Sequence, residues 1–407
     1  MIEDQAYYRR QQARVRADLD KRGLEGLLVL NPVHVFYLSG YQPNPPGIME
    51  RPVALFIDRD EGRTTLMLSI DAAAHTADQP ADGDASERLS EAPGIDDVLP
   101  FAEYPYADGV PTMEWISRQV EARGFRGRRI GVEDNYTTLN DGVCRNWFAH
   151  IEETFTGEVV PAGDLVSILR MVKEPEEVEL LRAASFWADE LVRELSQRIK
   201  PGRHVRELGE QAGAVLLERM RTELGTLTTS PANGQIILEG TPHGFIPSGS
   251  GYEPGTIPAD QPIIVNCVVC VGGYHGESER CGIVEPPTSR QKELFDIAME
   301  SQLRALAAVK PGVRCGDVDA IAAEFIRDAG FDYLYGVGHG IGLLGHEPPW
   351  VRPNSETVLE PNMVICVEPG LAVPGEGSFH NSQTVLVTED GNEPLTVYEG
   401  LHRIDFP

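Results

Sequence analysis

Hydrophobic positions in the first part of the chain come in short runs separated by charged stretches. A charged segment that reaches about Arg22 predicts a first helix, and the apolar run LEGLLVLNP after it predicts a buried strand. Further apolar runs occur in HVFYLSGY, RPVALFIDRD and RRIGVEDN, with polar or glycine-containing turns between them. Short strands that alternate with helices are typical of an α/β domain, which we place at residues 1–165.

The pattern changes in the stretch SILRMVKEPEEVELLRAASFWADELVRELSQRIKPG. Pro175 stands in a first turn rich in glutamate, a composition that helix N-termini favour. Val178 and Leu181 follow at helical spacing, and the Lys-Pro-Gly at Lys200 ends the helix. We therefore expect a second domain over residues 166–407.

The second domain contains a weak internal repeat. A long helix that ends at IKPG is followed by a second helix, and further on a long helix that ends at VKPG is followed by another. The second Lys-Pro-Gly, at Lys310, follows the first, at Lys200, by 110 residues. Two related halves of this kind are expected to place strands around a shared central cleft, which is a natural location for a site.

Composition and charge narrow the classes of function. The chain has 407 residues, of which 41% are hydrophobic and 24% charged, as in globular proteins. Its formal net charge of −28, from 35 basic and 63 acidic residues, argues against a nucleic-acid partner. No apolar run reaches the roughly 18 residues of a membrane span, and the charged N-terminus lacks the apolar core of a signal peptide. We expect a cytoplasmic protein with a small-molecule substrate and no membrane partner.

The six cysteines do not predict a disulfide framework. They are scattered through a long chain, whereas disulfide scaffolds are small and rich in cysteine. Cys267 and Cys270 form a single CxxC with no second ligand pair, so they do not predict a zinc knuckle. We expect both to be ordinary strand residues.

Four short segments of the second domain concentrate histidines and carboxylates. They are TPHGF with His243, the hairpin VNCVVCVGGYHGESERCG with Glu277 and Glu279, GVGHGIGLLGHEPPW with His339 and His346, and CVEPG with Glu368. All four are short and rich in glycine or proline, as strand ends at a cleft would be. Imidazoles and carboxylates serve as metal ligands and as acid/base groups, so these segments predict an active site.

The motifs MVKEPEEVELLRAA, GHGIGLLGHE and VICVEPGL together resemble the M24, or "pita-bread", family. The resemblance is strong from about residue 170 to 391 and weaker before it. It implies an α/β (α+β) creatinase/aminopeptidase architecture of two domains. The C-terminal catalytic domain of that architecture has pseudo-two-fold symmetry, in agreement with the internal repeat.

The resemblance also implies positions for metal ligands. The metallopeptidases of the family bind two metal ions through Asp, Asp, His, Glu and Glu. Those positions fall on Asn266, Glu277, His339, Glu368 and Ser382. Because an amide and a hydroxyl replace two carboxylates, two dications would lack compensating charge, and we expect no dinuclear centre. A single ion on Glu277, His339 and Glu368 stays open as an alternative.

Creatinase is the metal-free branch of the family, and the hairpin is similar to its corresponding segment. The similarity lies in Asn266-Cys267, Gly273-Tyr274 and Glu279-Arg280. It implies that His243 is the general acid/base and that Glu279 and Glu368 hold a cationic substrate. It also implies a homodimer in which Arg51 of one subunit binds the substrate carboxylate in the other. Glu277 and Glu347 depart from creatinase, which puts creatine itself in doubt as the substrate.

These features favour a metal-independent hydrolase, without a cofactor, that cleaves a C–N bond other than a peptide bond. The substrate would be a small cationic or zwitterionic metabolite, such as a guanidino acid or amidine. We expect His243, Glu279 and Glu368 to be catalytic, and the substrate to be bound by Arg51, Asn266, Glu277, His339 and His346. The alternatives are a metal-dependent member, either a Xaa-Pro peptidase or a lyase for a sulfonium substrate, an ectoine-hydrolase-like enzyme that opens a cyclic amidine, and an inactive binding module.

Overall fold

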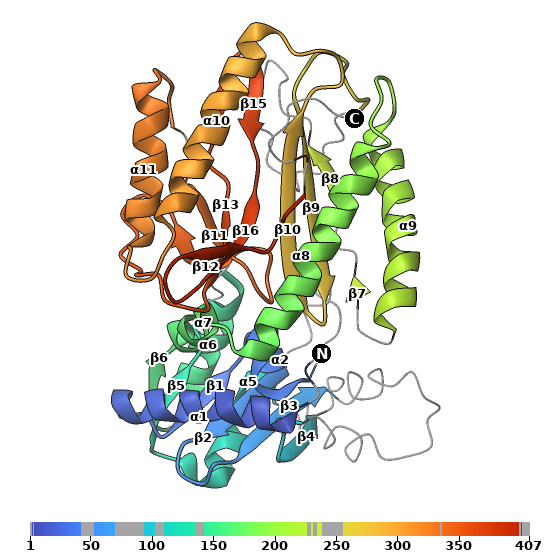
Figure 1. Ribbon diagram of the computed structural model, residues 1–407. Helices are drawn as coiled ribbons and strands as arrows, with labels where there is room; N and C mark the ends of the chain where they lie inside the picture. The colour runs from blue at the N-terminus through green and yellow to red at the C-terminus, as the bar shows by residue number, and fades with distance from the viewer. Residues whose placement is uncertain are drawn as a thin grey trace. The chain divides into compact units, whose positions relative to one another are not determined.

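The chain forms two compact units, Ile2–Arg170 and Met171–Pro407 (Figure 1). The computed structural model describes residues 2, 4–41, 53–69, 93–101, 110–134, 142–225, 229–230, 234–237, 255–333, 336–398 and 400. Helix α7 (Gly163–Met171) closes the first unit, because Leu165 is buried there and the Ser167 hydroxyl lies 3.4 Å from Nε2 of His34. The boundary therefore lies at the end of this helix and not near its start.

The N-terminal unit is built on a six-stranded mixed sheet. Its strands are β1 (Gly26–Val29), β2 (Val53–Asp58), β3 (Thr64–Ser69), β4 (Asp97–Phe101), β5 (Arg129–Val132) and β6 (Glu158–Pro161). They lie in the order β4-β3-β2-β1-β5-β6, with β1 antiparallel to β2 and parallel to β5. The helical segments besides α7 are α1 (Gln5–Arg22), α2 (Pro32–Ser39), α5 (Thr112–Val120), the π-helical η2 (Glu121–Phe125) and α6 (Gly142–Thr154). The alternation of helices and strands confirms the predicted α/β class.

The C-terminal unit contains two pairs of helices and a large antiparallel sheet. The helices are α8 (Pro175–Ser196), α9 (Val205–Leu224), α10 (Ser289–Ala308) and α11 (Cys315–Asp328). The strands of the main sheet are β7 (Thr229–Ser230), β8 (Gly234–Ile237), β9 (Ile263–Val271), β10 (Tyr274–Gly282), β11 (Gly338–Gly340), β12 (Glu347–Val351), β13 (Val364–Val367), β16 (Gln383–Val387) and β17 (Asn392–Pro394). A separate hairpin consists of β14 (Gly370–Val373) and β15 (Gly377–His380).

The two halves predicted from the repeated Lys-Pro-Gly are present. The main sheet runs in the order β12-β11-β13-β16-β10-β9-β7. Helices α8 and α9 pack on β9 of the first half, and α10 and α11 pack on strands of the second half (Figure 1). The halves meet where β10 pairs with β16, at Ser278 and Gln383. Carboxylates of β10 and the residues next to β16 are thereby brought together at the middle of the sheet.

The start of α8 is fixed by a buried glutamate. Glu177 accepts hydrogen bonds from the backbone N–H of Glu174 at 2.8 Å and from the Tyr274 hydroxyl at 2.9 Å. Burial raises the pKa of Glu177 to about 7, although these bonds and the nearby Lys173 act in the opposite direction. The N-terminus of the helix is therefore joined to β10 through a carboxyl group that resists ionisation.

The free energy of unfolding is expected to fall as the pH rises from about 4.5 to about 7. In this interval Glu177 keeps its proton in the folded state and loses it in the unfolded state. The unfolded side chain ionises near 4.5 and the folded one at about 7, so the folded state binds more protons between these values. The resulting loss is on the order of 3 kcal/mol and is complete above the folded pKa. In Glu177→Gln this pH dependence should vanish, because an amide does not titrate in this range. The fold should be kept, because the amide can still accept from Glu174 and donate to Tyr274.

Urea unfolding at about pH 5 and about pH 8 measures this effect. The matched control is Glu179→Gln, because the Glu179 side chain is 78% exposed and should leave the pH dependence unchanged. An equal fall in stability in the wild type and in Glu177→Gln would show that another group causes it.

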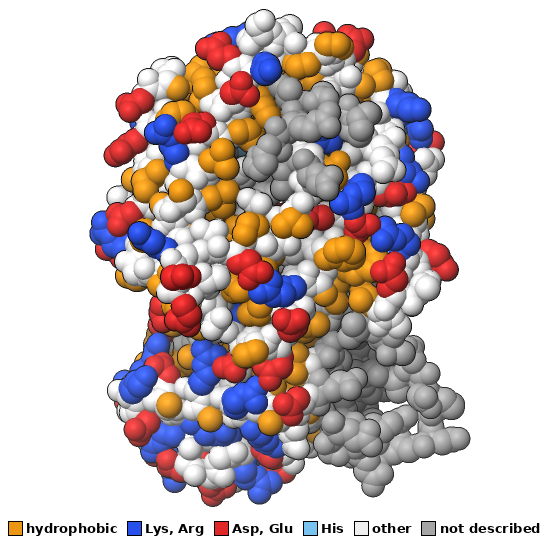
Figure 2. Space-filling view, in the orientation of Figure 1, with side chains coloured by type: hydrophobic (Ala, Val, Ile, Leu, Met, Phe, Trp, Pro, Cys, Tyr) orange, Lys and Arg blue, Asp and Glu red, His pale blue; other side chains and the backbone are white. Residues whose placement is uncertain are grey.

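The surface mixes charges of both signs. Figure 2 shows Lys and Arg side chains interspersed with Asp and Glu over the described part of the face in view. Several form ion pairs, such as Arg9 with Asp96 at 2.7 Å and Arg182 with Glu393 at 2.6 Å. Among the described residues, no helix is both long enough and apolar enough to cross a membrane.

Candidate active site

The hairpin of β9 and β10 places two carboxylates on one face. Residues alternate between the faces of a strand, so Glu277 and Glu279 share a side of β10 while Ser278 points to the other side. The Ser278 hydroxyl donates to Asp189 of α8 at 2.8 Å, which identifies the helix-covered face. Asn266 lies opposite Glu279 in the register of β9 and β10, and its amide nitrogen donates to Oε1 of Glu279.

The second half of the sheet supplies an imidazole and a third carboxylate. His339 lies in β11, and Glu368 directly follows β13, where its backbone N–H donates to Val337 at 2.7 Å. Nε2 of His339 lies 3.4 Å from Oε1 of Glu368 and 3.9 Å from Oε1 of Glu277. Strands from both halves therefore bring Glu277, His339 and Glu368 into one cluster.

Two further polar residues complete the walls of the cluster. The Ser382 hydroxyl donates to Oε1 of Glu277 at 2.9 Å. His380, at the end of β15, places Nε2 3.0 Å from Oε2 of Glu279. The sequence prediction missed His380, although it stands two residues before Ser382 and alternation would direct the two side chains the same way.

Unpartnered polar atoms remain at the centre of the cluster. Oε2 of Glu277 and Nε2 of His339 are buried and have no hydrogen-bond partner among the described residues. Nδ1 of His339 lies 3.0 Å from the carbonyl oxygen of Gly340, which can only accept, so Nδ1 carries a proton. A neutral His339 therefore directs its lone pair, on Nε2, toward the two carboxylates.

The ionisation of the cluster reflects its burial. Burial raises the pKa of Glu277, and the charge of Glu368 raises it further. Burial also opposes a charged imidazole, yet Glu368 and then Glu277 raise the pKa of His339 to about 10. The pKa of Glu368 is lowered by His339, although burial acts against this. A proton on His339 thus occupies the position between the carboxylates that a bound cation would take.

A divalent cation fits this set of residues. Donor atoms of Glu277, His339 and His346 lie within 4.8 Å of one another, and so do those of Glu277, Glu279 and Glu368. Ligands bound to one ion at about 2.1 Å stand about 3.4 Å apart, which matches the separation of Nε2 of His339 from Oε1 of Glu368. Two carboxylates and one imidazole also supply the charge that one dication needs.

His346 lies at the edge of the cluster, in a loop that is held by a buried ion pair next to it. Its exposed imidazole lies against that of His339, with ring centroids 3.9 Å apart and the ring planes tilted by 34°. The next residue, Glu347, is buried and pairs with the buried Lys173 at 3.2 Å. Oε2 of Glu347 also accepts from the backbone N–H of Leu344 at 3.2 Å, so this carboxylate fixes the loop that carries His346.

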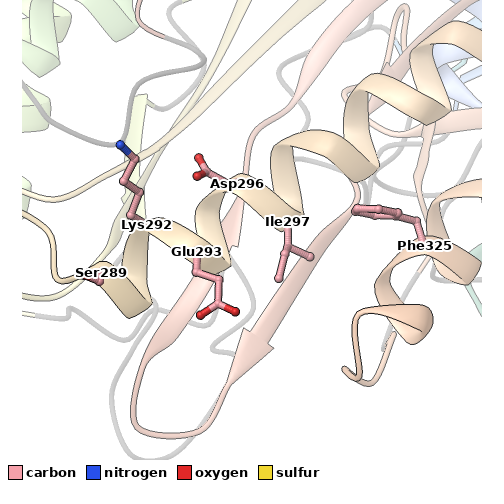
Figure 3. A pocket seen from close by; sticks show the side chains of 6 residues that line it. All are labelled: Ser289, Lys292, Glu293, Asp296, Ile297 and Phe325. Atoms are coloured by element: carbon pink, nitrogen blue, oxygen red, sulfur yellow. The ribbon is translucent and has the colours of Figure 1, made fainter.

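His243 and Arg51 lie outside the described residues, so their roles stay predictions. The pocket in Figure 3 is distinct from the cluster of Glu277, His339 and Glu368. Its lining residues belong to α10 and α11, and none of them is a predicted site residue. The five cysteines whose side chains are described are free thiols, as expected, and Cys267 of β9 packs in the core with residues of α8 and α9.

Comparison with known proteins identifies the family. The model of "Metallopeptidase family M24" matches residues 179–389, and that of "Creatinase/Prolidase N-terminal domain" matches residues 11–172. The chain belongs to metallopeptidase family M24. This result confirms the resemblance, the two-domain α/β architecture and the C-terminal fold that were predicted from the motifs.

Relatives within the M24 family are named as peptidases. The Xaa-Pro dipeptidase of Pyrococcus furiosus is 28% identical over 94% of this chain and 96% of its own length. The uncharacterized peptidase YqhT of Bacillus subtilis is 30% identical over 68% of this chain and 74% of its own. The crystal structure of dipeptidase PepE from Mycobacterium ulcerans matches with a TM-score of 0.78 at 23% identity, covering 99% of both chains, and shows the shared fold.

These M24 relatives correct the function predicted from the sequence. The prediction of a metal-independent amidinohydrolase that acts on non-peptide C–N bonds is wrong, because the relatives are Xaa-Pro dipeptidases of a metallopeptidase family. The error came from Asn266 and Ser382: because these neutral side chains remove two carboxylates, the metal-free mechanism was preferred and a single ion was kept only as an alternative. The structure brings Glu277, His339 and Glu368 together and leaves donor atoms of Glu277 and His339 without hydrogen-bond partners among the described residues.

Proposed function

We propose that the chain is a metal-dependent hydrolase that cleaves the peptide bond of Xaa-Pro dipeptides. The observation that carries the proposal is the cluster of the buried Glu277 and His339 with the partly buried Glu368, with unpartnered donor atoms on Glu277 and His339. The names of the relatives support the substrate class, and one of them matches over 94% of this chain. In this proposal Glu277, His339 and Glu368 hold a divalent cation.

The chemistry needs both the cation and the protein groups around it. When bound, a divalent cation lowers the pKa of a water molecule and polarises a carbonyl group. The Gly340 carbonyl orients His339 by accepting from Nδ1, which directs Nε2 to the ion. Glu277 is oriented by Ser382, and the buried surroundings strengthen each electrostatic interaction. Glu279, held by Asn266 and His380, faces the same space and is our candidate for contacting the substrate.

Two further predictions accompany this function. The five free cysteines described, three of them in the cores of the C-terminal unit, support a reducing cytoplasmic location. A homodimer in which Arg51 of the second subunit contacts the substrate also remains a proposal. It rests on the resemblance alone, and crosslinking in solution combined with Arg51→Ala would test it.

Metal removal is expected to abolish proline release. Protein dialysed against a chelator should release no proline from Ala-Pro, and added Mn²⁺ should restore the activity, since a ligand set of carboxylates and one imidazole suits this ion. Ala-Ala, which has no peptide bond before a proline, serves as the control substrate and should not be cleaved. His150→Ala is the control variant, because His150 is an exposed imidazole in α6 whose loss should change nothing. Proline release that persists in metal-free protein, or no release with any divalent ion, would refute the proposal.

A further inference from the structure

We infer that the site takes one divalent cation and not the pair that the metallopeptidase resemblance implies. This inference rests on the proposed function only for the position of the cation, on Glu277, His339 and Glu368. The remainder of the cluster, Asn266 with Glu279, is held by hydrogen bonds of this chain and binds no second ion.

The first argument concerns the oxygen atoms of Glu277. A carboxylate that bridges two ions with one oxygen on each needs both of its oxygens for metal. Here Oε1 of Glu277 accepts the hydroxyl of Ser382 at 2.9 Å, and Oε2 is the oxygen without a hydrogen-bond partner among the described residues. Glu277 is therefore prepared to give one oxygen to one ion, while Ser382 occupies the other.

The second argument concerns Glu279. The donor atoms of Glu277, Glu279 and Glu368 lie within 4.8 Å of one another, so this group is where a second ion would have to bind. Within this group of three described carboxylates, Glu279 is the one that the first ion does not use. The Asn266 amide donates to Oε1 of Glu279, and Nε2 of His380 lies 3.0 Å from Oε2. Both oxygens of Glu279 are thus already engaged by side chains of this chain, and a cation would have to displace the Asn266 amino group from Oε1.

The third argument concerns charge. Two dications carry four positive charges, and the cluster holds three carboxylates, one of them already paired with His380. Asn266 turns its amino group toward Glu279, and such a donor cannot ligate a cation. One dication is balanced by Glu277 and Glu368, whereas a second would remain uncompensated in a buried site, which is costly.

Metal content tests the inference without reference to activity. Full-length protein is saturated with Mn²⁺, freed of excess ion by dialysis, and analysed for manganese by mass spectrometry and electron paramagnetic resonance. We expect one ion per chain and a spectrum of isolated Mn²⁺. Two ions per chain with an exchange-coupled spectrum would overturn the inference, and so would the absence of any bound ion.

The reverse substitutions provide a gain of binding. The double variant Asn266→Asp with Ser382→Glu restores the two carboxylates, and we expect its metal content to double and its Mn²⁺ signals to couple. Asn354→Asp with Ser289→Glu, which adds the same charges at exposed positions, should stay at one ion. If the double variant folds, as judged by circular dichroism, and still binds one ion, the inference is wrong. If it does not fold, the metal content of the wild type decides alone.

The two proposals fail in different ways. One ion per chain without release of proline from any Xaa-Pro dipeptide would reject the proposed function and leave the inference standing. Proline release by a protein with two coupled ions would support the proposed function and reject the inference.

Discussion

Replacing Lys173 by methionine is expected to lower the free energy of unfolding of the C-terminal unit by about 3–5 kcal/mol. The Lys173 and Glu347 side chains are 1% and 3% exposed, and their charged atoms are 3.2 Å apart. Methionine has a similar length but no charge, so Glu347 would be left as a buried carboxylate without the cation that now compensates it, although the Leu344 N–H would still donate to it. Thermal and chemical denaturation measure the loss.

Two further variants distinguish the effect of leaving Glu347 without its charged partner from the effect of a packing defect. Lys292→Met makes the same substitution at an exposed position of α10 and should cost less than about 0.5 kcal/mol. Adding Glu347→Gln to Lys173→Met removes the stranded charge while the amide oxygen can still accept from Leu344, so it should recover much of the loss. A double variant no more stable than Lys173→Met would contradict the role of the pair.

Much of the fold could be predicted because it depends on local patterns. The proline and glutamates after Lys173 mark the start of α8, and the structure begins that helix at Pro175. The repeated Lys-Pro-Gly indicated two halves, and both are present as helix pairs packed on antiparallel strands. The end of α8 at Ser196, before Lys200, was predicted less well. Helix ends depend on contacts that a linear pattern does not contain.

The site was harder to predict, because its decisive contacts join distant parts of the chain. His380 pairs with Glu279 across 101 residues, and Lys173 pairs with Glu347 across 174. The type of residue at position 266 or 382 reveals whether a charge is present. It does not reveal which neighbouring side chain the residue contacts. The hydroxyl of Ser382 orients Glu277 and leaves one of its oxygens available, and only the folded arrangement shows this.

Replacing Glu277 by glutamine is expected to lower both Mn²⁺ affinity and the kcat/KM for Ala-Pro by more than about 100-fold. Even residues that only support a ligand typically cost 10–100-fold, and Glu277 is proposed to bind the ion directly. The amide keeps the shape of the side chain and can still accept from Ser382. Because burial and Glu368 raise the pKa of Glu277, its charge is costly in the metal-free protein. The metal-free variant should therefore be at least as stable as the wild type.

Thermal unfolding with and without Mn²⁺ distinguishes a lost ligand from a damaged fold. An ion at 100 times its dissociation constant stabilises the fold by about 2.7 kcal/mol, so the Tm of the wild type should rise with Mn²⁺. In Glu277→Gln the Tm should not respond, whereas Glu324→Gln, at an exposed position of α11, should behave as the wild type does. A Glu277→Gln protein whose Tm and activity still respond fully to Mn²⁺ would place the cation elsewhere, because a ligand set reduced to His339 and Glu368 lacks the charge to hold it.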